Sequence, residues 1–155
     1  MSKPKNSLKP SSHPEKDFEE KIIQINRVSK KTKGGNQIGF SILMVVGDKK
    51  GRVGVGLGKA PDVMSAIKKG VRRAKKNMFK VVMKNNTIPH DIRTKFGAAE
   101  ILLKPAPEGS GIIAGGAVRA VMEAAGINNV SSKVLGTRNQ ATNVYCAIKA
   151  LKLLK

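Results

Sequence analysis

The chain has 155 residues, with 30 Lys or Arg against 10 Asp or Glu, so its formal net charge at pH 7 is +20. A length of 155 residues with 40% hydrophobic side chains is enough for one domain or two small ones, which excludes a wholly disordered basic tail. This charge indicates nucleic acid as the default partner, while the lack of a long apolar run predicts a cytosolic protein with no membrane association.

Residues 1–17 are rich in Ser, Pro and Lys and have no apolar periodicity, so we predict a mobile basic tail there. A first domain is predicted for residues 18–81. Apolar and polar side chains alternate from Ile23 onward, which predicts a first strand that continues to Ser29.

A basic turn is expected after this strand, because residues 30–36 combine three lysines with two glycines. Residues 38–46 are almost all apolar and predict a mostly buried strand. The Gly-Asp-Lys-Lys-Gly stretch at 47–51 then has the chemistry of a hairpin turn and leads into a third strand at 52–57. Three consecutive antiparallel strands are therefore expected.

Gly54, Gly56 and Gly58 occupy every second position at the third strand. Side-chain-free positions on one face of a strand mean that something approaches closely, and the sequence leaves open whether that is a helix or an RNA backbone. An amphipathic helix is then predicted to begin near Asp62, where an acidic side chain suits the positive end of the helix dipole. Its predicted packing stripe consists of Val63, Ile67, Val71, Ala74 and Met78.

The other side of this helix is basic, and no acidic residue lies between Asp62 and Asp91. Like charges at three- and four-residue spacing destabilise a helix, which favours a polyanion at this surface over a merely solvated face. The basic residues of the helix and the stretch after it are Lys68, Lys69, Arg72, Arg73, Lys75, Lys76, Lys80 and Lys84.

A second domain is predicted for residues 82–155, with two helices packed on a small sheet. Its expected helices are residues 112–125, ended by Gly126 as a left-handed cap, and residues 139–154. The expected strands and turn are 81–83, a turn at 84–87, 99–103 and 130–135.

One motif resembles a nucleotide site. Gly109, Gly111 and Ala114 match the relaxed dinucleotide fingerprint and are expected to follow a strand and open a helix, but no acidic residue follows Glu123 to bind the ribose. These glycines could still bind a phosphate or could only allow close packing. Gly54 to Lys59 lacks the spacing of a P-loop. A small phosphotransfer enzyme therefore remains only an alternative, and we expect no small-molecule substrate and no cofactor.

Metal and acid-base chemistry find little support in the sequence. His13, His90 and Cys146 cannot form a zinc cluster, and we interpret Cys146 as a packed, structural residue. Arg119 and Glu123 stand four residues apart on a predicted helix and are expected to form a surface ion pair.

The aromatic residues are expected to lie in the core, so no base-stacking surface is predicted. RNA contact should then run through phosphate and sugar, as in recognition of structured RNA. These residues are Phe18, Phe40, Phe79, Phe96 and Tyr145.

Short motifs in a fixed order resemble the family of the fifth small-subunit ribosomal protein of bacteria, over nearly the whole chain after the tail. Each motif is weak alone, but their order and spacing together are specific. They are NRVSK at 26–30, KGG at 33–35, VVGD at 45–48, GRVG at 51–54, GKA at 58–60, KPA at 104–106 and EGSGIIAGGAVRAV at 108–121. The chain departs from the family's usual pattern at Asn36, where a basic residue is common, and at 136–143, which lacks a proline.

The resemblance implies an α+β protein of two small domains: an amino-terminal β-β-β-α domain like double-stranded-RNA-binding folds, and a carboxy-terminal α/β domain with the order β-β-α-β-α. It implies a structural, non-enzymatic component of the small ribosomal subunit that binds small-subunit rRNA, joins head to body and supports accurate decoding near the messenger RNA entry path. Small-subunit ribosomal proteins four and eight are the implied protein partners. A free-standing double-stranded-RNA binder or RNA chaperone is the nearest alternative.

Two groups of candidate site residues follow. The expected rRNA-binding residues are Arg27, Lys30, Lys31, Lys33, Gly34, Gly35, Arg52, Lys59, Lys69, Arg72, Arg73 and Lys76. The expected protein-interface or phosphate-approach residues are Gly109, Ser110, Gly111, Gly115, Gly116 and Arg119. No catalytic and no metal-binding residues are expected.

Overall fold

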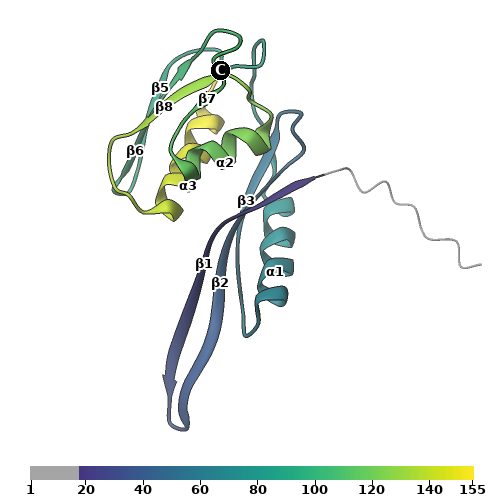
Figure 1. The fold of residues 1–155 in the computed structure, drawn as a ribbon, viewed down its shortest axis with the longest axis vertical. Coiled ribbons are helices and arrows are strands. Elements are labelled where there is room, and N and C mark those ends of the chain that lie inside the picture. The colour runs from purple at the N-terminus through teal and green to yellow at the C-terminus, as the bar shows by residue number, and fades with distance from the viewer. Residues whose placement is uncertain (1–17) are drawn as a thin grey trace, which may run out of the picture.

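The computed structural model describes residues 18–155, so the predicted tail lies outside the described part of the chain (Figure 1). The first sheet is antiparallel and runs in the order β1-β2-β3-β4. Its strands are β1 (Glu19–Thr32), β2 (Gly35–Gly47), β3 (Arg52–Ala60) and β4 (Phe79–Lys80), and α1 (Val63–Lys76) connects the last two. The predicted order of three strands and a helix is confirmed.

The second sheet has the order β5-β6-β8-β7, with β7 parallel to β8 and the other pairs antiparallel. Its strands are β5 (Ile92–Phe96), β6 (Ala99–Pro105), β7 (Ile112–Ile113) and β8 (Val130–Val134), and its helices are α2 (Gly116–Ala125) and α3 (Gln140–Leu153). The α+β fold class with two sheet-and-helix units is confirmed.

The two units pack into four layers. Helix α1 covers one face of the first sheet, and α2 and α3 lie between its other face and the second sheet (Figure 1). One hydrophobic cluster accordingly joins Val45 and Val53 of the first sheet to Val121 of α2 and Ile101 of the second sheet. A smaller cluster under α1 contains Ile42 and Met44, so alternate residues of β2 face opposite layers.

The β1–β2 hairpin extends well beyond both cores (Figure 1). Its strands are longer than predicted, because β1 continues to Thr32 and β2 already begins at Gly35. The expectation of a mostly buried second strand holds only from Ser41 onward, and Ile38 is 42% exposed. The reason is tertiary: α1 and α2 cover the base of the hairpin and no described element covers its end.

Helix α1 is the element that approaches the glycines of β3. A Cβ at Gly54, Gly56 or Gly58 would lie 2.2, 2.2 and 2.0 Å from backbone oxygens of α1. Such distances are far inside van der Waals contact, so only glycine permits this packing. Of the two possibilities that the sequence left open, the helix is the correct one.

The same contact corrects the predicted packing face of α1. Its fully buried residues are Ala66, Gly70 and Ala74, whereas Ile67 and Val71 are only partly buried. Small side chains let the helix backbone come down onto the strand glycines, so the centre of the interface is the small-residue row. The larger apolar residues are displaced toward β1.

Asp62 caps α1, and its carboxylate accepts a hydrogen bond of 3.0 Å from the Ser65 amide. Hydrogen bonds from Ser65 lower the pKa of Asp62. Since the folded pKa is depressed, the carboxylate stabilises the fold above the ordinary aspartate pKa, and this stabilisation is lost as pH falls through the lowered value.

Asp62→Ala should therefore lower the melting temperature of the chain at pH 7 by about 2–4 °C, while Asp62→Asn should retain most of the stability because Asn also caps helices. Thermal unfolding followed by circular dichroism measures both. The deficit of Asp62→Ala should shrink in acid, where wild-type Asp62 is protonated. A deficit that is unchanged at low pH would contradict a charged cap.

Several predictions for the second unit need correction. The helix expected from residue 112 begins at Gly116, because Ile112–Ile113 pairs with β8 as strand β7. The predicted strand at 81–83 is wrong, because these residues pair with no strand of the second sheet. The first strand of that sheet is instead β5, whose sequence alternates only briefly. Gly126 has φ +88° and caps α2 as predicted.

The aromatic residues are not all in the core, contrary to the prediction. Phe96 and Tyr145 are 41% and 36% exposed, and their ring centroids lie 5.9 Å apart on the surface. Cys146 is fully buried as predicted, and its thiol donates to the Thr94 carbonyl oxygen at 3.2 Å. Burial raises the pKa of the Cys146 thiol, in keeping with a packed, unreactive cysteine.

Candidate nucleic-acid interface

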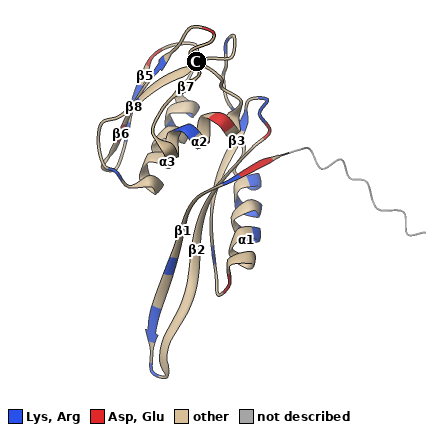
Figure 2. Ribbon diagram, in the orientation of Figure 1, with Lys and Arg blue, Asp and Glu red and all other residues tan. Residues whose placement is uncertain are grey.

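Positive charge is concentrated on the hairpin end and on the outer face of α1 (Figure 2). Three nearby acidic residues are engaged in other contacts: Glu19 pairs with Lys49, Glu123 pairs with Lys21, and Asp62 caps α1 through the Ser65 amide. The cations of the hairpin and the helix are therefore left for an external partner.

Four cations stand on the β1 side of the hairpin and its turn. Arg27, Lys30, Lys31 and Lys33 are all exposed, and none of the ion pairs found among residues 18–155 includes them. Because side chains alternate along a strand, Lys30 and Lys31 project from opposite faces of the hairpin. Both faces can thus meet phosphates at once.

The hairpin turn contains two adjacent glycines, Gly34 and Gly35. Gly35 has φ +128°, a conformation that favours glycine, and the Thr32 hydroxyl donates to its carbonyl oxygen at 2.8 Å. A Cβ on Gly34 would meet no atom of the described residues within 4 Å, so none of them requires glycine there. The absence of a side chain at Gly34 leaves room for another backbone to approach the turn.

Lys59, Lys69 and Arg73 are brought together where α1 meets β3. Lys69 Nζ donates to the Lys59 carbonyl oxygen at 3.3 Å, and the Arg73 guanidinium donates to the Leu57 carbonyl oxygen at 2.9 Å. These bonds hold two of the helix cations toward the strand. A hollow of about 380 Å³ lined by Lys30 and Lys59 connects this cluster to the base of the hairpin.

The remaining predicted rRNA residues are separated from that cluster. Arg72 and Lys76 lie on the crest of α1 away from β3, and both are exposed. Arg52 pairs with Lys80 of β4 at the opposite end of β3 from Lys59. The structure therefore brings together part of the predicted set and places Arg52 apart from it.

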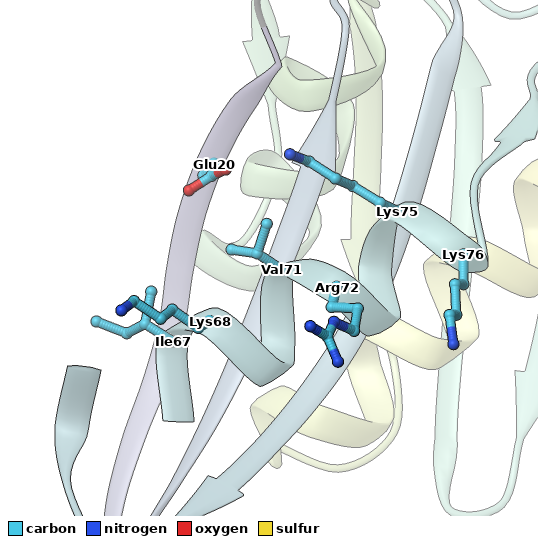
Figure 3. A pocket seen from close by; sticks show the side chains of 7 residues that line it. All are labelled: Glu20, Ile67, Lys68, Val71, Arg72, Lys75 and Lys76. Carbon is cyan, nitrogen blue, oxygen red and sulfur yellow. The ribbon is translucent and has the colours of Figure 1, made fainter. Parts of the chain in front are cut away.

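A second face of α1 borders an open groove toward β1 (Figure 3). Lys68 and Lys75 line this groove with the apolar Ile67 and Val71, and Lys75 Nζ lies 5.3 Å from the ring centroid of Phe18. Both lysines belong to the basic run of the helix but are not among the predicted rRNA-binding residues. Their helical spacing relative to Ile67 and Val71 is the sequence pattern that could have placed them beside this groove.

The glycine-rich segment does not form the predicted helix start. Gly109 and Gly111 have φ +87° and +71° and lie in the loop before β7, together with the exposed Ser110. The cap and first residue of α2 are instead Gly115 and Gly116. A phosphate bound by the amides at the start of α2 would therefore contact Gly115 and Gly116, and not Gly109 and Gly111.

Arg119 pairs with Glu123 on α2, with Nε 3.0 Å from Oε1, as the sequence predicted. The pair is partly exposed, so it contributes little to stability. Among residues 18–155 no cluster of His, Cys, Asp and Glu could hold a metal ion. No described helix combines the length and apolar character needed to span a membrane.

Two protein-family models match the chain. The model described as ribosomal protein S5, N-terminal domain, matches residues 18–82, and the model described as ribosomal protein S5, C-terminal domain, matches residues 94–155. The first match contains the hairpin, β3 and α1, and the second contains most of the second sheet with α2 and α3.

Proposed function

The chain belongs to the ribosomal protein S5 family, and on that basis we propose that its hairpin and basic helix bind small-subunit rRNA and help hold the head of the subunit on its body. Family membership makes the chain a structural, non-enzymatic protein of the small ribosomal subunit that binds rRNA. The phosphotransfer alternative is thereby excluded.

The observation that carries the proposal is the hairpin, which extends beyond both cores and carries four cations outside every ion pair found in residues 18–155 (Figures 1 and 2). An extended, two-sided basic element can enter a space between RNA helices, which a flat basic face cannot do. The cluster of Lys59, Lys69 and Arg73 continues the contact toward α1. The proposed rRNA surface consists of the hairpin cations Arg27, Lys30, Lys31 and Lys33, the turn glycines Gly34 and Gly35, and the cluster of Lys59, Lys69 and Arg73.

The finer assignments are also proposals. The segment from Gly109 to Arg119 is exposed at most positions, which supports a contact with ribosomal protein four, and ribosomal protein eight is the second proposed neighbour. We also propose that the protein supports translational accuracy near the messenger RNA entry path through these contacts. We place the protein in bacterial cytoplasmic ribosomes and its domain boundary between residues 81 and 82.

Sedimentation of a cell lysate tests the assignment. The chain should migrate with the small subunit and remain there after a wash at moderate salt, because many simultaneous phosphate contacts dissociate together. In binding assays with purified rRNA, log affinity should fall steeply and linearly with log salt concentration. A predominantly free pool, or a flat salt dependence, would instead favour a free RNA binder.

A further inference from the structure

Helix α1 leaves part of the first sheet uncovered. It contacts β2 and β3, and a groove of about 570 Å³ remains on its β1 side. The groove is lined by Glu20 of β1 and, from α1, by Ile67, Lys68, Val71, Arg72, Lys75 and Lys76 (Figure 3).

Apolar side chains of β1 continue the floor of this groove. Ile22 and Ile25 pair with Met44 and Ile42, which both pack under α1. Directly opposed residues of antiparallel strands project from the same face, so both β1 isoleucines lie on the α1 side of the sheet. They are 45% and 51% exposed.

Met64 extends the floor on the helix side, because it lies three and seven residues before Ile67 and Val71 on one face of α1. Its side chain is 64% exposed. The exposed apolar strip therefore consists of Ile22, Ile25, Met64, Ile67 and Val71. The basic rim beside it consists of Lys68, Arg72, Lys75 and Lys76.

An aliphatic floor does not suit RNA. Bases bind through aromatic rings or planar guanidinium groups, and branched aliphatic side chains offer neither. Covering such a strip stabilises a complex only if the ligand supplies apolar surface of its own. The cations of the rim, with Glu20 as the single acidic residue of the lining, require negative charge in the same ligand.

This chain cannot supply that ligand itself. Residues 1–17 precede Phe18 near the groove, but their lysines outnumber their acidic residues and three prolines interrupt them, so they match neither the charge nor a helix. A second copy of the chain carries the same net charge of +20 and would be repelled.

We propose that this groove binds an acidic, amphipathic segment of another protein. The apolar side chains of the segment cover the apolar strip, and its carboxylates pair with the basic rim. The surface is distinct from the proposed rRNA surface, because Lys69 and Arg73 turn toward β3 on the other flank of α1. Arg72 and Lys76, which the sequence predicts as rRNA-binding residues, line the groove and lie apart from the proposed rRNA surface.

Methyl NMR spectroscopy of the full chain, with Ile, Val and Met labelled, tests this proposal. The probe is a designed helical peptide of about 18 residues with leucine on one face and glutamate on the other. Saturable shifts are expected at the methyl groups of the apolar strip. A scrambled peptide of the same composition should bind at least about tenfold more weakly, since it lacks an apolar face.

Two double variants test whether the methyl shifts arise from peptide bound in the groove. Ile25→Ser with Met64→Gln removes exposed apolar contacts and should weaken peptide binding about tenfold, and Lys68→Glu with Lys75→Glu should do the same through charge. Leu135→Ser is the control, because Leu135 is 44% exposed directly after β8 in the second unit and its replacement should leave binding unchanged.

Three results would overturn the proposal. The first is the absence of shifts in the strip, or equal binding of the scrambled peptide. The second is unchanged affinity in both groove variants. The third is a short RNA duplex that shifts the strip methyl groups and displaces the peptide from the variant-sensitive site, which would assign the groove to nucleic acid.

Discussion

Replacing Arg27, Lys30, Lys31 and Lys33 together with glutamine should reduce rRNA affinity by about 10²–10⁴ at 0.1 M salt. Each lost phosphate contact lowers the slope of log affinity against log salt by about 1, so the slope should fall by about 4. All four side chains are exposed, and the three lysines lie beyond the part of β2 that pairs with β3, so folding should be little affected. Filter binding over a series of salt concentrations measures both quantities.

A control set distinguishes local contact from total charge. Lys95, Lys104, Lys133 and Lys152 are exposed in the second unit, and their replacement with glutamine changes the net charge by the same amount. The control should alter the salt slope by less than about 1. Equal losses in the two quadruple variants would show that bulk charge attracts the RNA, and the hairpin would lose its assigned role.

Gly56→Ala should destabilise the chain by about 3 kcal/mol or more, beyond the usual range for one added methyl group. The new Cβ would stand 2.2 Å from the Gly70 carbonyl oxygen and 2.5 Å from the Ala74 amide nitrogen. Both atoms belong to backbone, which cannot rotate away as a side chain does. Helix α1 must therefore lift from β3 or the strand must distort.

Urea denaturation of the full chain measures this loss as a lower midpoint. Gly34→Ala is the matched control, because its Cβ would meet no atom within 4 Å, and its free energy of unfolding should stay within about 0.5 kcal/mol of wild type. A small effect of Gly56→Ala would mean that α1 can slide on the sheet. Gly56→Ala should also lower RNA affinity, because hydrogen bonds to β3 position Lys69 and Arg73.

The residues of α1 show where sequence reasoning stops. Its start and its cap at Asp62 follow from local chemistry and are predictable, whereas the predicted stripe runs to Met78, past the observed end at Lys76. Its packing face was not predictable, because a hydrophobic stripe assumes that large side chains make the contact. Here Ala66, Gly70 and Ala74 make it, since β3 presents glycines that admit the helix backbone.

The second unit shows the same limit. Ile112 and Ile113 have apolar side chains that suit a helix as well as a strand, and only pairing with β8 decides for the strand. The exposure of Phe96 and Tyr145 likewise depends on which elements cover them. Such contacts join residues far apart in the sequence, so no local pattern contains them.

Composition and local patterns are enough to predict the polyanionic partner, the order of the first three strands and α1, the turn glycines and the Gly126 cap, and membership of the family through spaced motifs. These depend on charge, on backbone conformation and on residues near one another along the chain. The tertiary structure alone decided which cations gather beside β3, that the hairpin end is exposed, and that an apolar strip stays open beside α1. Those properties depend on how the layers pack, because burial and proximity arise only when distant segments meet.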